Sequence, residues 1–326
     1  MTVPLPRLRE RSITFANGSI GRNLDIPSAT PANYFEAISR PAEMVRVRID
    51  GKLFLPPEAS DSKPLPLVIV VPGSLGVAAS HLAHAETLTG IGIAAFVLDP
   101  FGARGEGSTV ANQTQYSFAA SAYDVLAAWK TLRTRPQIDA ARIGAQGHSR
   151  GGSAVLTAAC RRFADAGVGP GNGLKAALAA YPWSGHQFLD PAVGDTEIRV
   201  LMGDRDEWCS PMQVQGHVQA IRLTGGKASL RLFSGAAHSF DRGSPLARIE
   251  EAAVSPAALT AYIADDGAFI HPLEGAPDPR LKDRDLMVYG LKSGYGRKGA
   301  TIGTRGAEAS LFRADMIAYW QRTLQP

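Results

Sequence analysis

The sequence predicts an α/β fold, a mostly parallel β-sheet with helices on both faces, and two observations lead to this prediction. Continuous apolar runs at 67–71 and 93–98 show no alternation with polar residues, which is typical of strands buried on both faces. Segments with the periodicity of amphipathic helices, such as 118–132, separate runs of this kind. Because repeated strand–helix units build parallel sheets, we expect right-handed crossovers between the strands.

The expected elements follow one another along the chain. Residues 1–40 are rich in Pro, Asn, Ser and Arg and are expected to form an irregular N-terminal extension. Residues 44–55 are expected to form a hairpin that turns at Asp50-Gly51. Strands are expected at 67–71, 93–98, 142–146, 176–181, 199–202 and 229–233, the first two of them buried. Helices are expected at 79–89, 118–132, 151–162, 213–223 and 307–324.

The chain is therefore divided into a core and additions. The α/β core is expected over 41–241, and a helix within 305–326 is expected to close it. Residues 242–304 do not continue the alternation, since they hold Pro, Gly, Asp, Lys and Arg in mixed order. This C-terminal appendage is interpreted as a cover over the site, a contact in a homodimer, or a packed addition. Three aromatic residues in this otherwise polar segment favour the first two interpretations: Tyr262, Phe269 and Tyr289.

Composition excludes several classes of protein. The 326 residues are 45% hydrophobic and 20% charged, which suits one sizeable globular core. Lys plus Arg number 34 and Asp plus Glu 30, so the net charge is +4, without the clustered basic module that nucleic-acid binding needs. Cys160 and Cys209 are too few for a disulfide framework, and no Cys/His cluster has zinc spacing. We therefore expect no metal, no cofactor and no nucleic-acid partner.

The expected location follows from the absence of segments that read as a signal peptide or a membrane span. The N-terminus has no apolar stretch of signal-peptide length before charges appear. No uninterrupted apolar run reaches the roughly 18 residues of a membrane span. A soluble cytoplasmic protein without a membrane partner is therefore the expectation.

A nucleophile motif occurs between an expected strand and an expected helix. The residues Gly147-His148-Ser149-Arg150-Gly151 fit the pattern G-x-S-x-G. A nucleophile elbow requires this strand–turn–helix setting, and its glycines let the strand and helix approach closely. Ser149 would then stand at a helix N-terminus, where backbone N–H groups are free. The alternative is a serine that serves as an ordinary helix N-cap.

Candidates for a base and an acid follow later strands. A serine hydroxyl needs a base, and the base needs an orienting acid, in the chain order Ser, Asp or Glu, His. Asp204 and Asp206 follow the strand 199–202, and His238 follows the strand 229–233. Both places are carboxyl ends of strands, where open α/β sheets carry their sites. Asp206 is favoured over Asp204, which suits a turn, and a structural role is the alternative for His238.

Backbone amides are the candidates for an oxyanion hole. One donor is expected to be the amide of Arg150, the residue after the nucleophile. The other is expected from Ser74 or Leu75, in the Gly-containing loop after the strand 67–71. The alternative is that this loop is a plain connection between a strand and a helix.

Five segments together resemble the dienelactone hydrolase family and its carboxylesterase relatives. They are Val71-Pro72-Gly73-Ser74, Leu98-Asp99-Pro100-Phe101-Gly102-Ala103-Arg104-Gly105, Gly147-His148-Ser149-Arg150-Gly151-Gly152, Gly203-Asp204-Arg205-Asp206 and Gly235-Ala236-Ala237-His238-Ser239-Phe240. The resemblance implies an α/β-hydrolase fold, no metal, and hydrolysis of esters or lactones through an acyl-enzyme. It also supports Asp206, because the family's acid ends a G-x-x-D pattern.

The sequence departs from the family pattern in three respects. The name-giving enzymes use a cysteine nucleophile where this chain has Ser149, which favours a general serine esterase. The N-terminal extension is long, and about 65 residues separate His238 from the closing helix. We therefore expect a carboxylic ester hydrolase that acts on a small ester or lactone. The alternatives are an acyltransferase, thioesterase or peptidase with the same triad, or a non-catalytic binding protein.

Three further residues are candidates for a substrate pocket. Arg104 lies in the loop 99–105, which is expected beside the site, and its guanidinium could bind a substrate carboxylate. An Arg that braces the loop through a nearby Asp or carbonyl is the alternative. Trp183 and Trp208 follow expected strands and could line an acyl or alcohol pocket, with core packing as the alternative.

Overall fold

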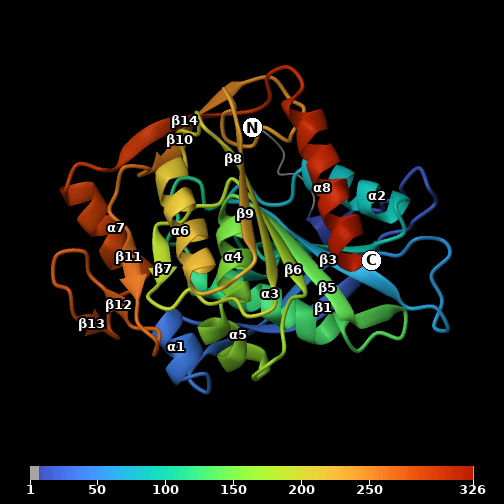
Figure 1. The fold of residues 1–326 in the computed structure, drawn as a ribbon, viewed down its shortest axis with the longest axis horizontal. Coiled ribbons are helices and arrows are strands. Elements are labelled where there is room, and N and C mark those ends of the chain that lie inside the picture. Colours follow the sequence, from blue (N-terminus) through green and yellow to red (C-terminus); the bar gives the residue numbers. More distant parts are fainter. Residues whose placement is uncertain (1–6, 326) are drawn as a thin grey trace.

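An eight-stranded sheet forms the centre of the molecule, in a computed structural model that describes residues 7–325 (Figure 1). The strand order is β1-β2-β4-β3-β5-β6-β8-β9. The strands are β1 (Arg22–Thr30), β2 (Val45–Phe54), β3 (Leu65–Val71), β4 (Ala94–Asp99), β5 (Ile138–His148), β6 (Ala176–Ala180), β8 (Glu197–Gly203) and β9 (Ala228–Phe233). β2 pairs antiparallel with β1 and β4, and all other pairings are parallel. This is the predicted α/β-hydrolase fold.

Helices cover both faces of this sheet. The helices are α1 (Tyr34–Ser39), α2 (Ala79–Gly90), α3 (Phe118–Leu132), α4 (Arg150–Ala159), α5 (Arg161–Val168), α6 (Pro211–Leu223), α7 (Asp283–Lys292) and α8 (Glu308–Leu324), with short 3-10 turns at Leu8–Glu10 and Gly102–Arg104. α2 and α8 pack together on one face, and α3 packs with α4 on the other (Figure 1). The closing helix α8 buries Trp320 against β5, where a Cβ on Gly144 would collide with the indole ring.

The N-terminal part of the chain differs from the expectation. The predicted hairpin at 44–55 is wrong, because β2 runs straight through Asp50-Gly51 and pairs with β1 along its whole length. β1 comes from the segment that was expected to be irregular. Gly51 is needed for close packing rather than for a turn, since a Cβ there would collide with the backbone of Val97 and the ring of Phe96.

The helix predicted at 151–162 is broken in the structure. Cys160 adopts an extended backbone with φ −63° and ψ 127°, and it separates α4 from α5. The other predicted helices and the six predicted strands are present, with ends that differ by a few residues.

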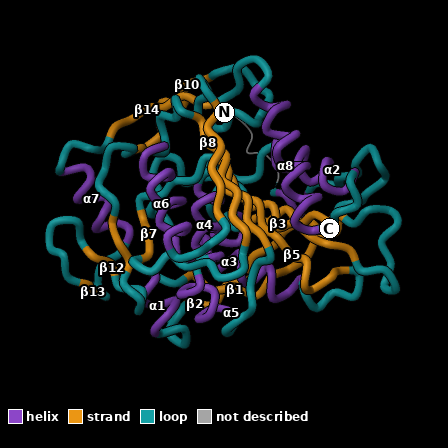
Figure 2. The backbone as a smooth tube through the Cα atoms, in the orientation of Figure 1, coloured by secondary structure: helices purple, strands orange, loops and turns teal. Residues whose placement is uncertain are grey.

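Residues 242–304 form two small sheets and a helix at one side of the core (Figure 2). β10 (Ala247–Val254) pairs antiparallel with β14 (Arg297–Ile302). The second sheet contains β11 (Ala261–Ile263), β12 (Phe269–Ile270), β13 (Pro277–Asp278) and β7 (His186–Phe188). Because β7 belongs to the core segment, this part of the chain is joined to the core by strand pairing.

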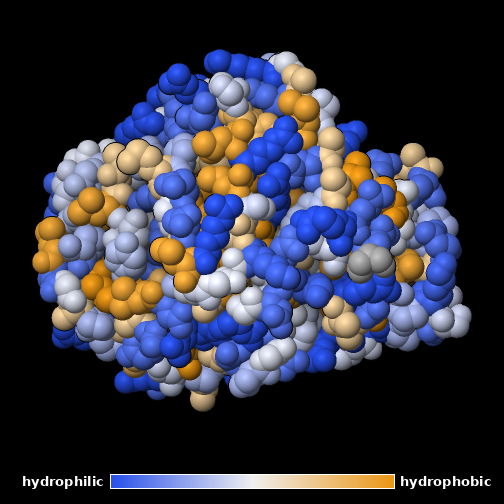
Figure 3. All heavy atoms as spheres, in the orientation of Figure 1, coloured by the Kyte–Doolittle hydropathy of each residue, from blue (hydrophilic) through white to orange (hydrophobic). Residues whose placement is uncertain are grey.

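The surface in Figure 3 mixes hydrophilic side chains with separate hydrophobic patches. Among the helices of residues 7–325, none combines the length and the apolar character that a bilayer crossing requires.

Candidate active site

Ser149 occupies a strained turn between β5 and α4. Its φ is +55°, a region that non-glycine residues rarely adopt and that is often found at functional sites. Gly147 and Gly151 make the turn possible, because a Cβ on Gly147 would collide with Gly151 and one on Gly151 with Val71. The local sequence therefore folds into the sharp strand–turn–helix geometry of a nucleophile elbow.

A continuous hydrogen-bonded chain connects Ser149 with His238 and Asp206. His238 Nε2 lies 2.9 Å from Ser149 Oγ, and His238 Nδ1 lies 2.7 Å from Asp206 Oδ2. All three residues come from loops at the carboxyl ends of parallel strands, as the chain order predicts. With its proton on Nδ1, His238 donates to Asp206 and can accept the hydroxyl proton of Ser149.

The structure places Asp206, and not Asp204, beside the imidazole. Asp206 Oδ1 accepts hydrogen bonds from the backbone amides of Trp208 at 2.8 Å and Cys209 at 2.9 Å, which fix the carboxylate. Asp204 is exposed, and its Oδ1 accepts a hydrogen bond from the amide of Gly235 at 2.7 Å. Asp204 is thus a residue of the turn.

Two aromatic rings enclose the imidazole of His238. The indole of Trp208 stacks on it with 5.1 Å between ring centroids and an interplanar angle of 13°. The ring of Tyr181 contacts it from another side at 4.7 Å with an angle of 65°. No sequence motif marks Tyr181, and its strained backbone, with φ of +38° at a strand end, is seen only in the structure. Both rings shield the imidazole from water.

The thiol of Cys209 also lies at this site and is buried. Burial, reinforced by the carboxylate of Asp206, raises the pKa of this thiol well above its usual value. Cys209 therefore stays protonated at neutral pH, and a protonated thiol is a weak nucleophile.

Strand β14 fastens the loops that carry His238 and Asp206. Gly303 N donates to His238 O at 2.9 Å, directly after an isolated parallel bridge between His238 and Ile302. Thr301 N donates to Glu207 Oε2 at 2.9 Å, and Trp208 Nε1 donates to Thr301 O at 3.1 Å. The hydrogen bonds from Thr301 lower the pKa of Glu207. This support comes from the C-terminal appendage, and no sequence motif predicts it.

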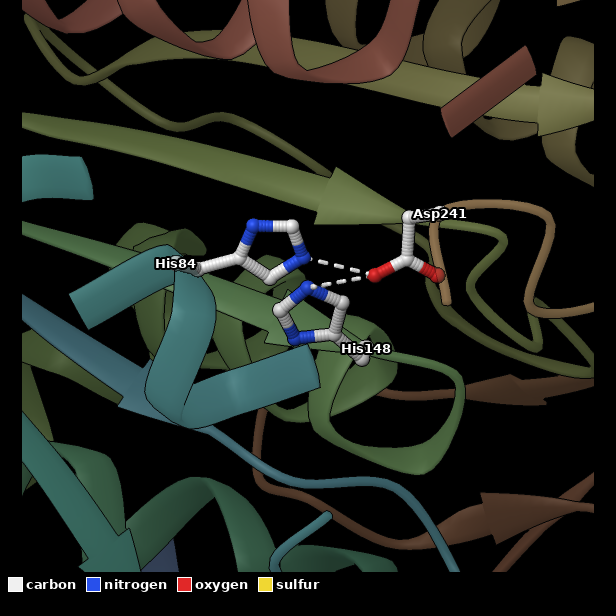
Figure 4. A group of neighbouring side chains, drawn as sticks. All are labelled: His84, His148 and Asp241. Atoms are coloured by element: carbon white, nitrogen blue, oxygen red, sulfur yellow. Dashed lines mark hydrogen bonds and ion pairs between the residues drawn. The ribbon is translucent and has the colours of Figure 1, made fainter. Parts of the chain in front are cut away.

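A second buried cluster of polar side chains lies behind Ser149 (Figure 4). His84 Nε2 lies 2.7 Å and His148 Nε2 3.6 Å from the same oxygen of Asp241. Tyr181 donates its hydroxyl to the other oxygen at 2.7 Å. Burial lowers the pKa of His148 to about 4, so this imidazole is neutral at pH 7. Burial acts to raise the pKa of Asp241, but the hydrogen bond from His84 and the nearby His148 lower it overall.

The composition of this cluster is that of a possible metal site. Its three ligand atoms lie within 4.8 Å of one another, and two imidazoles with a carboxylate suit several transition metals. However, Asp241 is already hydrogen-bonded to His84, and within residues 7–325 no group orients His84 Nδ1. Metal-binding imidazoles normally have such a partner. We therefore interpret the cluster as a polar support in which hydrogen bonds from His84 and Tyr181 hold Asp241 in the loop that follows His238.

The amides expected to form an oxyanion hole lie beside Ser149. Arg150 is the first residue of α4, so its amide has no acceptor within the helix. Ser74 borders the same cavity as Ser149, and its loop is fixed by Thr109 N, which donates to Ser74 O at 2.8 Å. Within residues 7–325 the amides of Ser74 and Leu75 donate no hydrogen bond to another protein group.

Of the three predicted pocket residues, the structure places two at the cavity. Trp208 borders it beside His238, and Trp183 lies in its wall between Phe118 and His186, each at 4.6 Å between ring centroids. Arg104 does not border it. Its guanidinium is buried and forms an ion pair with Asp124 at 2.7 Å, which corresponds to the loop-bracing alternative and not to a carboxylate-binding group.

Comparison with known proteins finds similarity in sequence and in fold. Residues 49–262 match the sequence model of the dienelactone hydrolase family. No curated protein matches the sequence. Among solved structures, the chain is similar to a dienelactone hydrolase-like promiscuous phosphotriesterase from metagenomic libraries, with 16% identity and a TM-score of 0.51 over 84% of this chain and 95% of that chain.

Two further solved structures are more distant in shape. A putative dienelactone hydrolase from Klebsiella pneumoniae subsp. pneumoniae has 19% identity and a TM-score of 0.47, over 68% of this chain and 89% of that one. Esterase 2 from Thermogutta terrifontis has 18% identity and a TM-score of 0.48, over 60% and 81%.

Proposed function

Because the chain belongs to the dienelactone hydrolase family, we propose that it is a serine hydrolase that cleaves carboxylic esters or lactones through an acyl-enzyme on Ser149. The observation that carries the proposal is the hydrogen-bonded chain from Ser149 Oγ through His238 to Asp206, at 2.9 and 2.7 Å. A serine at a strained elbow, paired with an oriented imidazole, is the arrangement that activates a hydroxyl at neutral pH.

The reaction proceeds in two stages. Ser149 Oγ attacks the carbonyl carbon while His238 Nε2 accepts the hydroxyl proton, and Asp206 stabilises the imidazolium. The bond to the leaving alcohol then breaks, and His238 donates the proton to the alcohol oxygen. A water molecule, deprotonated by His238, attacks the acyl-enzyme, which releases the carboxylic acid and restores Ser149.

Backbone amides stabilise the charge that develops in this reaction. The amide of Arg150, together with that of Ser74 or Leu75, donates to the oxyanion of the tetrahedral intermediate. Each such donor is worth roughly 3–4 kcal/mol of transition-state stabilisation in serine hydrolases. The N-terminus of α4 adds its favourable dipole at the same place.

The proposal is tested by Ser149→Ala, with Ser153→Ala as a matched control in the same helix. Ser153 Oγ donates to Trp183 O at 2.6 Å and to Ser149 O at 3.4 Å, and neither bond involves the Ser149 hydroxyl or His238, so we expect this control to retain activity. We expect Ser149→Ala to fold, to lose labelling by a fluorophosphonate probe, and to lose about 10⁶-fold in kcat on p-nitrophenyl acetate. Labelling or turnover that survives in Ser149→Ala contradicts the proposal.

A second experiment separates hydrolysis from acyl transfer, which the triad alone does not distinguish because both reactions can use it. Wild-type enzyme is incubated with the ester in the presence of an alcohol or amine acceptor, and the products are identified. We expect the free carboxylic acid as the main product. A new ester or amide as the main product would assign the chain to acyl transfer.

A further inference from the structure

Two cavities of different size meet at Ser149. The larger has a volume of about 280 Å³ and lies on the side of Arg150, while the smaller has about 30 Å³ and is bordered by His238 and Tyr181. In the proposed mechanism His238 protonates the departing alcohol, so the alcohol leaves on the side of the imidazole. The acyl group then occupies the larger cavity, away from His238.

The walls of the larger cavity are mainly apolar. Phe118 and Trp183 form one wall from the core, and Leu286 and Met287 of α7 form the facing wall. Its volume lies at the lower end of the range for small-molecule sites. Such a cavity suits a hydrocarbon chain or ring of moderate size. The transfer of this apolar surface out of water contributes favourably to the free energy of binding.

The cations at this cavity are either engaged by protein groups or exposed at its rim, so they offer little to an anionic acyl group. Arg150 is buried and its guanidinium donates to Ser121 Oγ at 2.9 Å, Gln113 O at 2.7 Å and Tyr116 O at 2.6 Å. Its central carbon also lies 4.1 Å from the centroid of the Phe118 ring, which covers it. This cation is therefore already engaged and offers little to a substrate carboxylate.

Asp283 adds a negative charge to the same wall. Its Oδ2 accepts a hydrogen bond from Phe118 N at 3.0 Å, and burial raises its pKa to about 6, so it is mostly ionised at neutral pH. His186, 3.5 Å away, is neutral because burial lowers its pKa to about 3. Arg297 and Lys298 also border the cavity, but both are exposed at its rim and remain hydrated.

About a third of the residues that line this cavity belong to a part of the chain that the family model does not cover. The family match ends at residue 262, whereas α7 and β14 follow it. This part is fixed to the core: Asn33 Nδ2 donates to Pro279 O and Leu281 O, both at 2.9 Å, and Asp283 binds Phe118 N. The cavity wall that α7 forms is therefore held in a fixed position relative to the core.

We infer that the cavity between α7 and the core is the acyl-binding site and that it selects esters of neutral, apolar carboxylic acids of medium size. This inference rests on the proposed function, since it assigns the acyl side from the role of His238. It deepens that function by naming the substrate class and the segment that determines it.

Gly290 offers a direct test. It lies in α7, is buried and borders the cavity, and a Cβ at this position meets no atom within 4 Å. A larger side chain at 290 therefore extends into the cavity. Gly216 is the matched control, because it also lies in a helix with open space around a Cβ, but it is exposed and distant from the cavity lining.

The experiment measures kcat/KM by proton release on methyl esters from acetate to dodecanoate, and on monomethyl adipate beside methyl heptanoate. Wild-type enzyme is expected to prefer a medium-chain ester over methyl acetate, and methyl heptanoate over the anionic adipate, each by about tenfold or more. Gly290→Leu should lower the ratio of kcat/KM for heptanoate to that for acetate by about tenfold or more, and Gly290→Ala by less. Gly216→Leu should leave this ratio unchanged.

The outcomes distinguish this inference from the proposed function. If Ser149 reacts with the fluorophosphonate probe but acetate or adipate is the better substrate, the acyl-site inference is wrong while the hydrolase proposal stands. An unchanged ratio in both Gly290 variants also overturns the inference. If Ser149 reacts neither with the probe nor with any ester, both proposals fall.

Discussion

Replacing Asp206 by Asn should invert the hydrogen bonding of His238 without unfolding the protein. The position of Oδ1 must hold an acceptor, because the amides of Trp208 and Cys209 donate to it at 2.8 and 2.9 Å. The Asn oxygen therefore takes this place, and its NH₂ group faces His238 Nδ1, which lies 2.7 Å from the present Oδ2. The imidazole must then accept at Nδ1 and carry its proton on Nε2.

The magnitude follows from this change of tautomer. A protonated Nε2 cannot accept the proton of Ser149, although it lies 2.9 Å from the hydroxyl oxygen. The same substitution in trypsin costs about 10⁴-fold in kcat, which corresponds to about 5 kcal/mol of barrier. Every buried polar group keeps a partner in the variant, so we expect the free energy of unfolding to change little.

The assay is steady-state turnover of p-nitrophenyl acetate at neutral pH, with urea unfolding as the check on stability. Asp204→Asn is the matched control, because it lies two residues away, is exposed, and can keep its hydrogen bond from Gly235 N through the amide oxygen. We expect the control to retain wild-type activity. The reasoning is refuted if Asp206→Asn stays within tenfold of wild type or if Asp204→Asn loses as much activity.

Two further predictions concern stability. Arg104→Ala leaves the fully buried carboxylate of Asp124 without its ion-pair partner, and urea unfolding should show a loss of about 3–5 kcal/mol, whereas a loss below 1 kcal/mol would contradict the pairing. Asp283 has its pKa raised by burial from 3.8 to about 6, so the wild-type protein should lose about 2 kcal/mol as pH rises from 4 to 7 relative to Asp283→Asn. A pH-independent difference between these two proteins would show that burial does not perturb Asp283.

The sequence predicts the central strands and the arrangement of Ser149, Asp206 and His238 for a shared physical reason. Strands buried on both faces are apolar along most of their length. β3 and β4 can therefore be recognised in the sequence without knowing which strands pair with them. Parallel strands bring their carboxyl ends to one edge of the sheet, so residues far apart in the chain can be expected together. Neither inference depends on long-range detail.

The remaining elements lack such a local signal. β1 lies at the edge of the sheet, and most of its first half is exposed, so its sequence shows no apolar run. Asp50-Gly51 has the composition of a turn, but Gly51 is required by the packing of Phe96 and Val97 across the sheet. Local sequence cannot distinguish a glycine that permits a turn from one that permits a close contact between strands.

The support of the imidazole shows why the C-terminal appendage is needed for the site. β9 is the last strand of the sheet and is only partly buried, so the loop with His238 has a neighbouring strand on one side alone. β14 compensates through Gly303 N, and it holds the loop of Asp206 through Thr301. Proton transfer between Ser149 and His238 depends on distances of about 3 Å, which a loop fixed on one side would not maintain. A segment without catalytic groups is therefore a condition for the catalytic geometry that we propose.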